Sequence, residues 1–422
     1  MKVFLTIIGL ILFNILFSQN PQALSLENCR AEAVKNYPLT KQLELYSSSS
    51  DLELVNIKKN YLPNIEINGQ ASYQSEVTEI PINMPGVKIP SLSKDWYKIT
   101  MNVNQMIFDA NLTKTQKEIN QADLLINKQN VEIELYKLKE RVNSVFFSII
   151  LLKEKSKLLD VFKDEIQEKL SNVRSGVNNG VLLSSEENVL KAELLKIEQQ
   201  VTEVETSLSS LVKVLSQLTS IDISINTELL LPKIQITPDL LFNNRLEYRL
   251  LDLHKQKIQS LKEIVNINTR PKIFGFGQLG YGRPGLNMLS DNFDTYYIIG
   301  AKLSWSPWDW KKSENQNKIL DIQSDIIESQ KETYDKNFSI SLETAMAEIV
   351  KFKKLIQKDQ EIIDLRKQIS KTASARFDNG VISSTDLITE LNTETQAKLN
   401  LQTHILQLIQ AKINVLAIIG EL

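Results

Sequence analysis

The chain has 422 residues and a formal net charge of −2, so it lacks the basic surplus with which nucleic-acid-binding proteins hold phosphates. Its single cysteine, Cys29, excludes an internal disulfide and a cysteine-rich metal site. Two histidines leave little material for a histidine-based site, and no serine, cysteine or carboxylate is accompanied by both a candidate base and an orienting partner. The sequence therefore predicts no enzymatic activity, no cofactor and no bound metal.

The N-terminus has the layout of a secretory signal peptide. Lys2 precedes an apolar run from Val3 to Phe17, and cleavage is expected after Ser18, which makes residues 1–18 the predicted signal peptide. An uncleaved membrane anchor is the alternative interpretation of this run. No further apolar run is long enough to cross a bilayer as a helix. We therefore expect an exported chain that is periplasmic, secreted or built as an outer-membrane β-barrel.

The predicted first repeat, residues 19–218, begins with helices. Apolar residues recur with helical spacing from Ser25 to Leu62, and Pro38 divides this stretch into two predicted helices. Pro63 ends the second helix, because a residue that precedes a proline avoids helical angles.

A strand hairpin is predicted over residues 64–107. Apolar and polar residues alternate from Ile65 to Tyr73 and again from Tyr97 to Val103. Each run is about ten residues long, as a tilted transmembrane strand requires. A half-buried soluble hairpin would show the same alternation. The predicted signal peptide is the feature that favours the membrane.

A long helical hairpin is predicted over residues 109–218, with its tip near 177–185. Apolar residues follow 3-4 spacing on both sides of this tip, for example at Leu135, Leu138, Val142, Leu194, Ile197 and Val201. Heptads sustained over this length favour an antiparallel coiled coil. An ordinary amphipathic bundle would have shorter helices and a different period.

The same order of elements returns after a predicted connector, residues 219–244. The second repeat, residues 245–422, is expected to contain a helix, a strand hairpin over 272–307 and a helical hairpin over 309–422 with its tip near 377–385.

Two features of the second repeat resemble functional motifs by their letters alone. The run Gly275-Phe-Gly-Gln-Leu-Gly280 matches the dinucleotide-binding fingerprint. Arg283-Pro284 and a polar loop follow it where that fingerprint needs a helix, so we interpret the run as a strand. His404 falls on the heptad seam, where we expect a satisfied polar core residue rather than a ligand.

The two tips have nearly the same sequence, two hundred residues apart. The first reads Val-Asn-Asn-Gly-Val-Leu-Leu-Ser-Ser-Glu over 177–186, and the second reads Phe-Asp-Asn-Gly-Val-Ile-Ser-Ser-Thr-Asp over 377–386. An Asn-Gly pair suits a helix end, because both residues tolerate the left-handed conformation. Ser184 and Glu187 are expected to form a capping box for the returning helix. The duplication predicts two helical hairpins per chain.

This duplicated order resembles the TolC-like outer membrane efflux proteins, over nearly all of the chain after the signal peptide. The resemblance rests on Ser25-Leu-Glu-Asn-Cys-Arg-Ala-Glu-Ala-Val-Lys-Asn-Tyr-Pro38, on Tyr61-Leu-Pro63 and Arg270-Pro271 before the strand hairpins, on Phe108-Asp109 and Trp308-Asp309 after them, and on the two tips. It implies a mixed α and β fold in which long coiled-coil hairpins are joined to four transmembrane β-strands per chain. Three chains would form a twelve-stranded β-barrel in the outer membrane, continued by an α-helical barrel across the periplasm.

The need to close a β-barrel also favours a homotrimer. Four strands cannot close a barrel, and open sheet edges are not tolerated in lipid. Three copies of the chain supply twelve strands, which is an even number within the range observed for outer-membrane barrels.

The resemblance also implies where the functional residues lie. A periplasmic adaptor protein, which connects the channel to an inner-membrane pump, would dock at the tips, on Asn179, Gly180, Val181 and Ser184 in the first repeat and on Asn379, Gly380, Val381 and Ser384 in the second. Gate carboxylates would lie on the lumen side at Asp386 and at its first-repeat counterpart, Glu186. Thr389 stands where the family can carry a second acid, so a strong carboxylate ring is not implied. Asp386 also suits the start of a helix, where the dipole favours an acid.

Two functions fit these expectations. The first is the outer-membrane channel of a tripartite efflux pump or of a type I secretion system, which extends into the periplasm and has no chemistry of its own. The second is a soluble periplasmic coiled-coil adaptor or scaffold, which would have no lipid-facing strands. Drugs, metal ions and secreted proteins are all open as cargo of the channel.

Overall fold

The structure is a computed structural model that describes residues 23–78, 92–236 and 244–422. The predicted signal peptide, residues 1–18, lies outside these residues. In chain order the elements of the first half are β1 (Leu24–Ser25), α2 (Leu26–Asn36), the 3₁₀ helix η1 (Pro38–Thr40), α3 (Lys41–Lys59), β2 (Asn64–Tyr73), β3 (Asp95–Phe108), α4 (Leu112–Asn178) and α5 (Ser184–Thr219). Those of the second half are β4 (Leu229–Leu230), α6 (Leu246–Ile267), β5 (Lys272–Arg283), β6 (Asp294–Ser304), α7 (Lys312–Asp378) and α8 (Ser384–Ile419).

The element order is duplicated, as the two tips predict. In each half a helix, two strands and two long helices follow one another. Helices α4 and α7 have 67 residues each, and α5 and α8 have 36 residues each. The predicted break at Pro38 is also confirmed, because this proline opens a separate 3₁₀ helix between α2 and α3. The fold class is therefore mixed α and β with two long helical hairpins, as expected.

The chain divides into two compact units that cut across the two repeats. Within the described residues, one of them, the tip unit, consists of 23–42, 130–236, 244–248 and 332–422. The other, the sheet unit, consists of the described residues 43–78, 92–129 and 249–331. Each unit takes segments from both repeats, and the long helices α4 and α7 contribute residues to both units.

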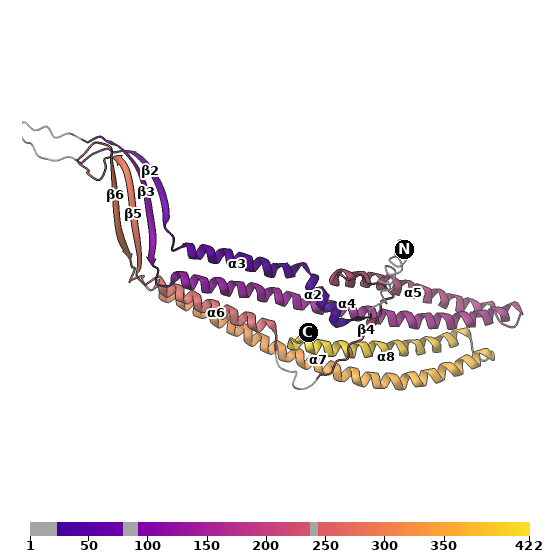
Figure 1. Cartoon of the computed structure of the whole chain (residues 1–422). Helices are drawn as coiled ribbons and strands as arrows, with labels where there is room; N and C mark the ends of the chain where they lie inside the picture. The colour runs from indigo at the N-terminus through magenta and orange to yellow at the C-terminus, as the bar shows by residue number, and fades with distance from the viewer. Residues whose placement is uncertain (1–22, 79–91, 237–243) are drawn as a thin grey trace, which may run out of the picture. The chain divides into compact units, whose positions relative to one another are not determined.

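The sheet unit contains one antiparallel sheet with the strand order β2-β3-β5-β6 (Figure 1). The two strand hairpins join through β3 and β5, so segments far apart in the sequence share one sheet. Directly paired residues form rows across the four strands, and one such row is Ile67, Met101, Leu279 and Tyr297. Because side chains alternate along a strand, this row and its neighbours make one face of the sheet apolar.

The glycine-rich run of the second repeat lies inside β5, which confirms that it is a strand. Gly280 pairs directly with Tyr296 of β6, on the face opposite to the apolar one. A Cβ atom at Gly280 would collide with the Tyr296 ring. The glycine is needed here because the aromatic side chain lies flat across the neighbouring strand.

Both strand hairpins lead into the long helices through the same turn. In the first repeat the Asp109 carboxylate accepts hydrogen bonds from the backbone N of Asn111 at 3.0 Å and of Thr113 at 2.7 Å. In the second repeat the Asp309 carboxylate accepts one from the backbone N of Ser313 at 2.8 Å. The first N–H groups of a helix have no partner inside the helix. An aspartate in this place satisfies them, which explains why one follows each strand hairpin.

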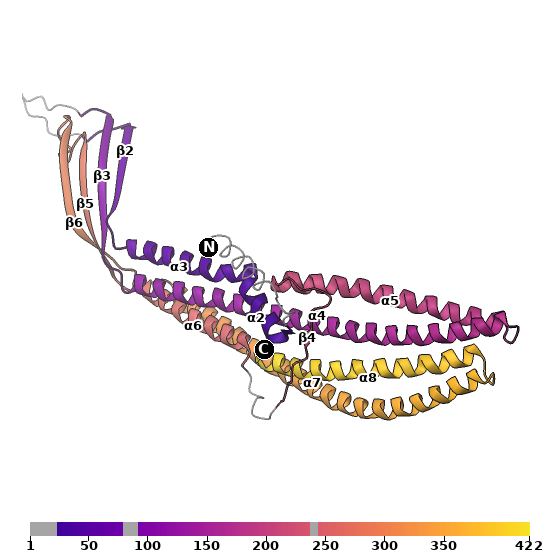
Figure 2. The same ribbon diagram turned by 45° about the vertical axis from the view of Figure 1, so that its right-hand side comes forward.

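In the tip unit the hairpins α4–α5 and α7–α8 run side by side (Figures 1 and 2). Their shared core draws on all four helices, and each large apolar side chain buried there contributes about 1.5–3 kcal/mol. The core consists of Leu159, Phe162, Ile166, Leu170 and Val173 of α4, Leu190, Ile197 and Val204 of α5, Ala373 of α7, and Leu387, Ile388 and Leu391 of α8.

His404 lies between α7 and α8 and is satisfied there, as predicted. Its Nδ1 is 2.5 Å from Oδ2 of Asp359, and its ring centroid is 6.0 Å from that of Phe352. Buried polar groups in folded proteins are nearly always paired in this way. The histidine is therefore a core contact of the second hairpin.

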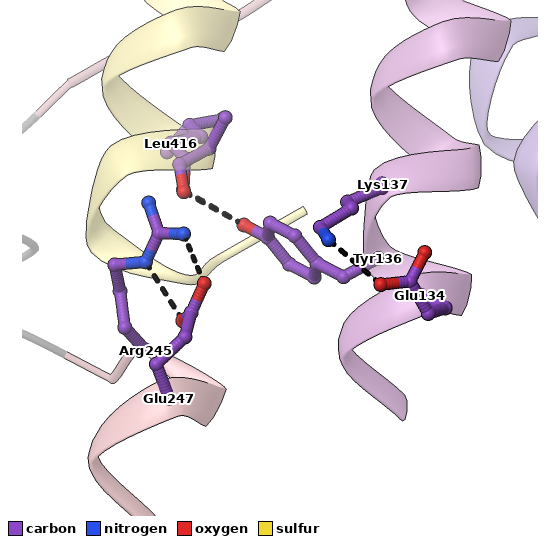
Figure 3. A network of polar contacts seen from close by, with 7 residues as sticks. Glu134, Tyr136, Lys137, Arg245, Glu247 and Leu416 are labelled. Atoms are coloured by element: carbon purple, nitrogen blue, oxygen red, sulfur yellow. Dashed lines mark hydrogen bonds and ion pairs between the residues drawn. The ribbon is translucent and has the colours of Figure 1, made fainter. Parts of the chain in front are cut away.

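The end of α8 is fastened to α4 through Tyr136 (Figure 3) and to the segment that precedes α6 through Asn244. The Tyr136 hydroxyl donates to the carbonyl oxygens of Ala417 at 3.0 Å and Leu416 at 3.4 Å. The backbone N of Asn244 donates to the carbonyl of Ile419 at 2.8 Å. The last four carbonyls of a helix have no partner within it. Those of Leu416 and Ala417 also accept hydrogen bonds from the backbone N of Glu421 and Gly420, so Tyr136 adds to an existing cap, and Asn244 satisfies the Ile419 carbonyl.

Candidate functional site

Both hairpin tips close their first helix in the same way. Gly180 (φ 74°) and Gly380 (φ 70°) take the left-handed conformation just beyond α4 and α7. In the first tip the backbone N of Gly180 donates to the Val177 carbonyl at 3.0 Å, and that of Val181 donates to the Gly176 carbonyl at 2.8 Å. The second tip repeats both bonds at the corresponding positions. This is the Schellman arrangement, and the helix end predicted at Asn-Gly is confirmed.

The capping box expected from Ser184 and Glu187 is wrong. Helix α5 begins at Ser184, so its N-cap is Leu183, whose side chain has no oxygen that could cap a helix. The helix starts one residue earlier than the box requires, and Ser184 is already helical. Glu187 pairs instead with Arg174, 3.0 Å away, and with Lys191, 2.8 Å away.

The second tip does form a capping box, between Ser383 and Asp386. The Ser383 hydroxyl accepts a hydrogen bond from the backbone N of Asp386 at 3.2 Å, and the Asp386 carboxylate accepts one from the backbone N of Ser383 at 3.1 Å. The hydrogen bonds from Ser383 lower the pKa of Asp386 below its ordinary value. Asp386 therefore stays ionised at the start of α8, where the sequence expects an acid.

Glu186 occupies the corresponding position in the first tip but binds the other hairpin. Its Oε2 accepts a hydrogen bond from the backbone N of Ser384 at 2.6 Å. Ser384 is the first residue of α8, so a carboxylate from α5 helps to satisfy the N-terminus of a helix from the second repeat. Glu186 and Asp386, which occupy corresponding positions in the two repeats, thus both bind at the N-terminus of α8.

Two further polar contacts join the hairpins near the tips. Lys169 Nζ of α4 lies 2.8 Å from Oδ1 of Asp378 at the end of α7, and the Asn392 amide of α8 donates to Glu193 of α5 at 2.9 Å. The Asp378 side chain is half exposed. Because solvent screens such a pair, it contributes at most about 1 kcal/mol. The apolar core shared by the hairpins is the larger source of their association.

The turns themselves present apolar side chains to solvent. Val181 is 77% exposed, Leu183 72% and Val381 62%. These three side chains are exposed apolar groups on the two turns. Ser384 is buried, whereas the other predicted docking residues are exposed, namely Asn179, Gly180, Val181, Ser184, Asn379, Gly380 and Val381.

A groove of about 630 Å³ runs between α7 and α8 just below the second tip. Its lining combines the apolar side chains of Leu365 and Ile369 with the charged ones of Arg376, Asp386 and Glu390. The sequence did not lead us to expect this groove. The signal for it was the pair Leu365 and Ile369, which are one helical turn apart, lie outside the heptad seam and are exposed.

Within the described residues, no helix is both long enough and apolar enough to cross a membrane. Scans of the sequence against protein-family models and against curated proteins give no match.

The fold, in contrast, matches solved structures over almost its whole length. The outer membrane protein VceC of Vibrio cholerae matches with a TM-score of 0.69 and 11% identity, over 94% of this chain and 96% of that one. The CmeC outer membrane channel of Campylobacter jejuni matches with a TM-score of 0.69 and 15% identity, over 94% and 85%. The MtrE outer membrane channel of Neisseria gonorrhoeae in its open state matches with a TM-score of 0.68 and 12% identity, over 94% and 88%. The chain therefore has the fold of outer membrane channels of the TolC type, as the sequence resemblance leads one to expect.

Proposed function

We propose that this chain is one of three identical subunits of an outer-membrane channel that passes solutes from the periplasm to the exterior. The observation that carries the proposal is the sheet with one continuous apolar face. That face is exposed on all four strands, with Ile67 72%, Leu279 53% and Ile299 80% exposed. A soluble protein would bury such a face in its core, whereas a strand in the outer membrane turns it towards lipid.

The height of the apolar face fits a membrane. At about 3.3 Å per residue the stretch of β5 from Ile273 to Tyr281 is roughly 26 Å long. A strand tilted by about 35–45° therefore spans roughly 20 Å of the ~25 Å apolar band of outer-membrane barrels with this stretch. Aromatic side chains flank the band at both ends, as such barrels require at the two interfaces. Tyr97, Tyr281 and Phe293 lie at the end of the sheet that bears the hairpin loops, and the exposed Trp305, Trp308 and Trp310 follow β6 at the end that adjoins the helices.

The edges of the sheet support a homotrimer. Strands β2 and β6 are the two outer strands of the sheet, and four strands are too few to close a barrel. In a ring of three chains β2 of one copy pairs with β6 of the next, so that twelve strands close and the edges disappear.

The helices of the sheet unit carry apolar stripes that fit the same assembly. Leu45, Leu52 and Val55 of α3 are exposed at helical spacing, and so are Ile319, Ile322 and Ile326 of α7. An apolar stripe at helical spacing usually packs against a neighbouring element, such as another helix. A neighbouring copy of the chain supplies that helix in a ring.

The tips suit the docking of a periplasmic adaptor. The exposed Val181, Leu183 and Val381 offer an apolar end surface, and the groove between α7 and α8 opens beside it. An adaptor that contacts both would link the channel to an inner-membrane pump, which supplies the energy. The complete assembly would be a tripartite efflux pump or a type I secretion system.

The carboxylates of Glu186 from α5 and Asp386 from α8, which meet at the start of α8, suit a gate. Glu186 holds the first hairpin to the second, and Asp386 lines the groove beside it. While both hairpins stay together at the tips, the channel is closed, and movement of α8 away from α5 opens it. No step of this process needs bond chemistry, so the proposed activity is passive conduction and not catalysis.

The experiment that tests the proposal combines membrane extraction with conductance. Membranes from cells that express the full chain are washed with alkaline carbonate, and the purified protein is added to planar lipid bilayers. We expect the protein to stay in the washed membranes and to produce discrete conductance steps. Release by carbonate without conductance would instead identify a soluble periplasmic adaptor or scaffold.

A further inference from the structure

The loop between β5 and β6 exposes three large apolar side chains. Leu286 is 55% exposed, Met288 56% and Leu289 59%. Loops that face water are usually made of polar and turn-forming residues. Several neighbouring apolar side chains on such a loop therefore indicate a surface that is covered in use.

Hydrogen bonds within this loop and to the residues before β3 hold its shape. The Asp291 carboxylate accepts hydrogen bonds from the backbone N of Ser93 at 2.9 Å and from the Ser93 hydroxyl at 2.7 Å, and Ser93 belongs to the segment that precedes β3. Within the loop, the Asn287 side chain accepts a hydrogen bond from the backbone N of Leu289 at 3.1 Å, and the Asn287 carbonyl accepts one from the backbone N of Ser290 at 3.1 Å. The side chains of Asp291 and Asn287 are thus engaged in hydrogen bonds, while the apolar side chains of the loop are exposed.

The end of the loop is continuous with the apolar face of the sheet. The Phe293 ring stacks on the Tyr281 ring, with centroids 5.5 Å apart, and lies 6.3 Å from the Tyr97 ring. Tyr97 pairs with Arg283 in the register of β3 and β5, and Tyr281 lies two residues before Arg283, so all three side chains belong to the apolar face. Phe293 therefore extends that face from the strands into the loop.

The one cation in this aromatic cluster is neutralised within the described structure. The Arg283 guanidinium lies over the Phe293 ring, 5.5 Å from its centroid, and forms an ion pair with Asp95. An aromatic cluster with a paired charge suits the boundary between acyl chains and headgroups, where amphipathic side chains settle. A surface meant for an acidic or basic protein partner would keep a free charge.

We propose that the β5–β6 loop contacts the membrane, with the side chains of Leu286, Met288 and Leu289 immersed in the outer leaflet. The proposal rests on the proposed function, because the loop adjoins an outer leaflet only if the sheet spans the outer membrane. Interfacial segments bury their apolar face by roughly 5–10 Å at the headgroup boundary. The loop would thereby fix the depth of the barrel in the membrane.

A polarity-sensitive fluorophore on single cysteines tests this proposal. The full chain is labelled as Met288→Cys and reconstituted into phosphatidylcholine vesicles, some of which carry a nitroxide near the headgroup end of the acyl chain. Ile299→Cys on the apolar face is the positive control, and Glu76→Cys in the described part of the β2–β3 loop is the aqueous control. Cys29 is buried, and burial raises the pKa of its thiol to about 12, so the unsubstituted chain should take up no label.

We expect the label at Met288 to show blue-shifted emission and to lose intensity to the lipid nitroxide, as at Ile299, while the label at Glu76 is quenched by aqueous iodide. Iodide quenching at Met288 together with lipid quenching at Ile299 would overturn the loop proposal alone. Self-quenching between labels at Met288 without lipid quenching would also overturn it, since it would assign the loop to contact between copies. Loss of lipid quenching at Ile299 would reject the channel itself.

Discussion

The Glu186 carboxylate lies 2.6 Å from the backbone N of Ser384, so a residue of the first repeat binds the N-terminus of a helix in the second. The corresponding residue of the second repeat, Asp386, closes a capping box within its own tip. The corresponding carboxylates of the two tips therefore make different contacts. One carboxylate stabilises its own hairpin and the other joins the two hairpins.

Replacing Glu186 with alanine should loosen the tips. The substitution removes the acceptor for the Ser384 N–H, and the loss of a cap of this kind costs about 0.5–2 kcal/mol. We expect a higher basal conductance in planar bilayers at unchanged subunit composition. Glu187→Ala is the matched control, because its partners Arg174 and Lys191 belong to the first hairpin. Equal conductance of the two variants would contradict the role of Glu186 in closure.

Replacing Gly180 and Gly380 with valine should impair adaptor docking. Valine at positive φ costs roughly 1–3 kcal/mol per residue, which would distort both turns. A variant with asparagine at both positions separates strain from size, because asparagine tolerates this conformation. We expect the valine pair to lose export while remaining trimeric, and the asparagine pair to keep more of it. Normal export by the valine pair would argue against docking at the tips.

A lysine on the apolar face of β6 should block membrane insertion. Ile299 pairs with Gly277 on that face, whereas its neighbour Ile298 pairs with Gln278 on the polar face. A lysine at the middle of the lipid-facing surface costs about 2–4 kcal/mol. We expect Ile299→Lys to be found outside the carbonate-washed membrane and Ile298→Lys to be retained. Retention of both variants would mean that the face does not meet lipid.

Tyr136 should contribute stability that disappears in alkali. Burial raises its pKa from 10.0 to about 12, because the ionised phenolate is disfavoured there. The contribution is therefore complete below pH 10 and is lost as the pH rises through about 12. Tyr136→Phe removes the bonds to the end of α8 and should cost about 1 kcal/mol at neutral pH. The difference in melting temperature between the two proteins should shrink across this pH range, and a constant difference would rule out the assignment.

The order of elements could be predicted from the sequence because it depends on local patterns. The change from helical to alternating periodicity at Pro63 marks β2, and the Asn-Gly pairs mark both tips, since each follows from the conformations that a few adjacent residues allow. Asp109 and Asp309 also act locally, because each accepts a hydrogen bond from the first turn of the helix that follows it.

Other features depend on packing and could not be predicted in this way. The start of α5 differs from expectation by a single residue, which moves the cap from Ser184 to Leu183 and removes the expected box. The bond between Glu186 and Ser384 joins positions 198 residues apart. It exists because the two hairpins pack together, and no local pattern encodes that. The groove at Leu365 was not expected for a different reason, because its local signal, the exposed pair Leu365 and Ile369, lies outside the heptad seam.

The proposed channel requires three chains in one particle. The most direct test is the mass of the detergent-purified protein by light scattering, combined with negative-stain images of the same sample. We expect particles of three chains that carry a barrel at one end. Monomers or dimers without a barrel end would contradict it and would identify a soluble scaffold.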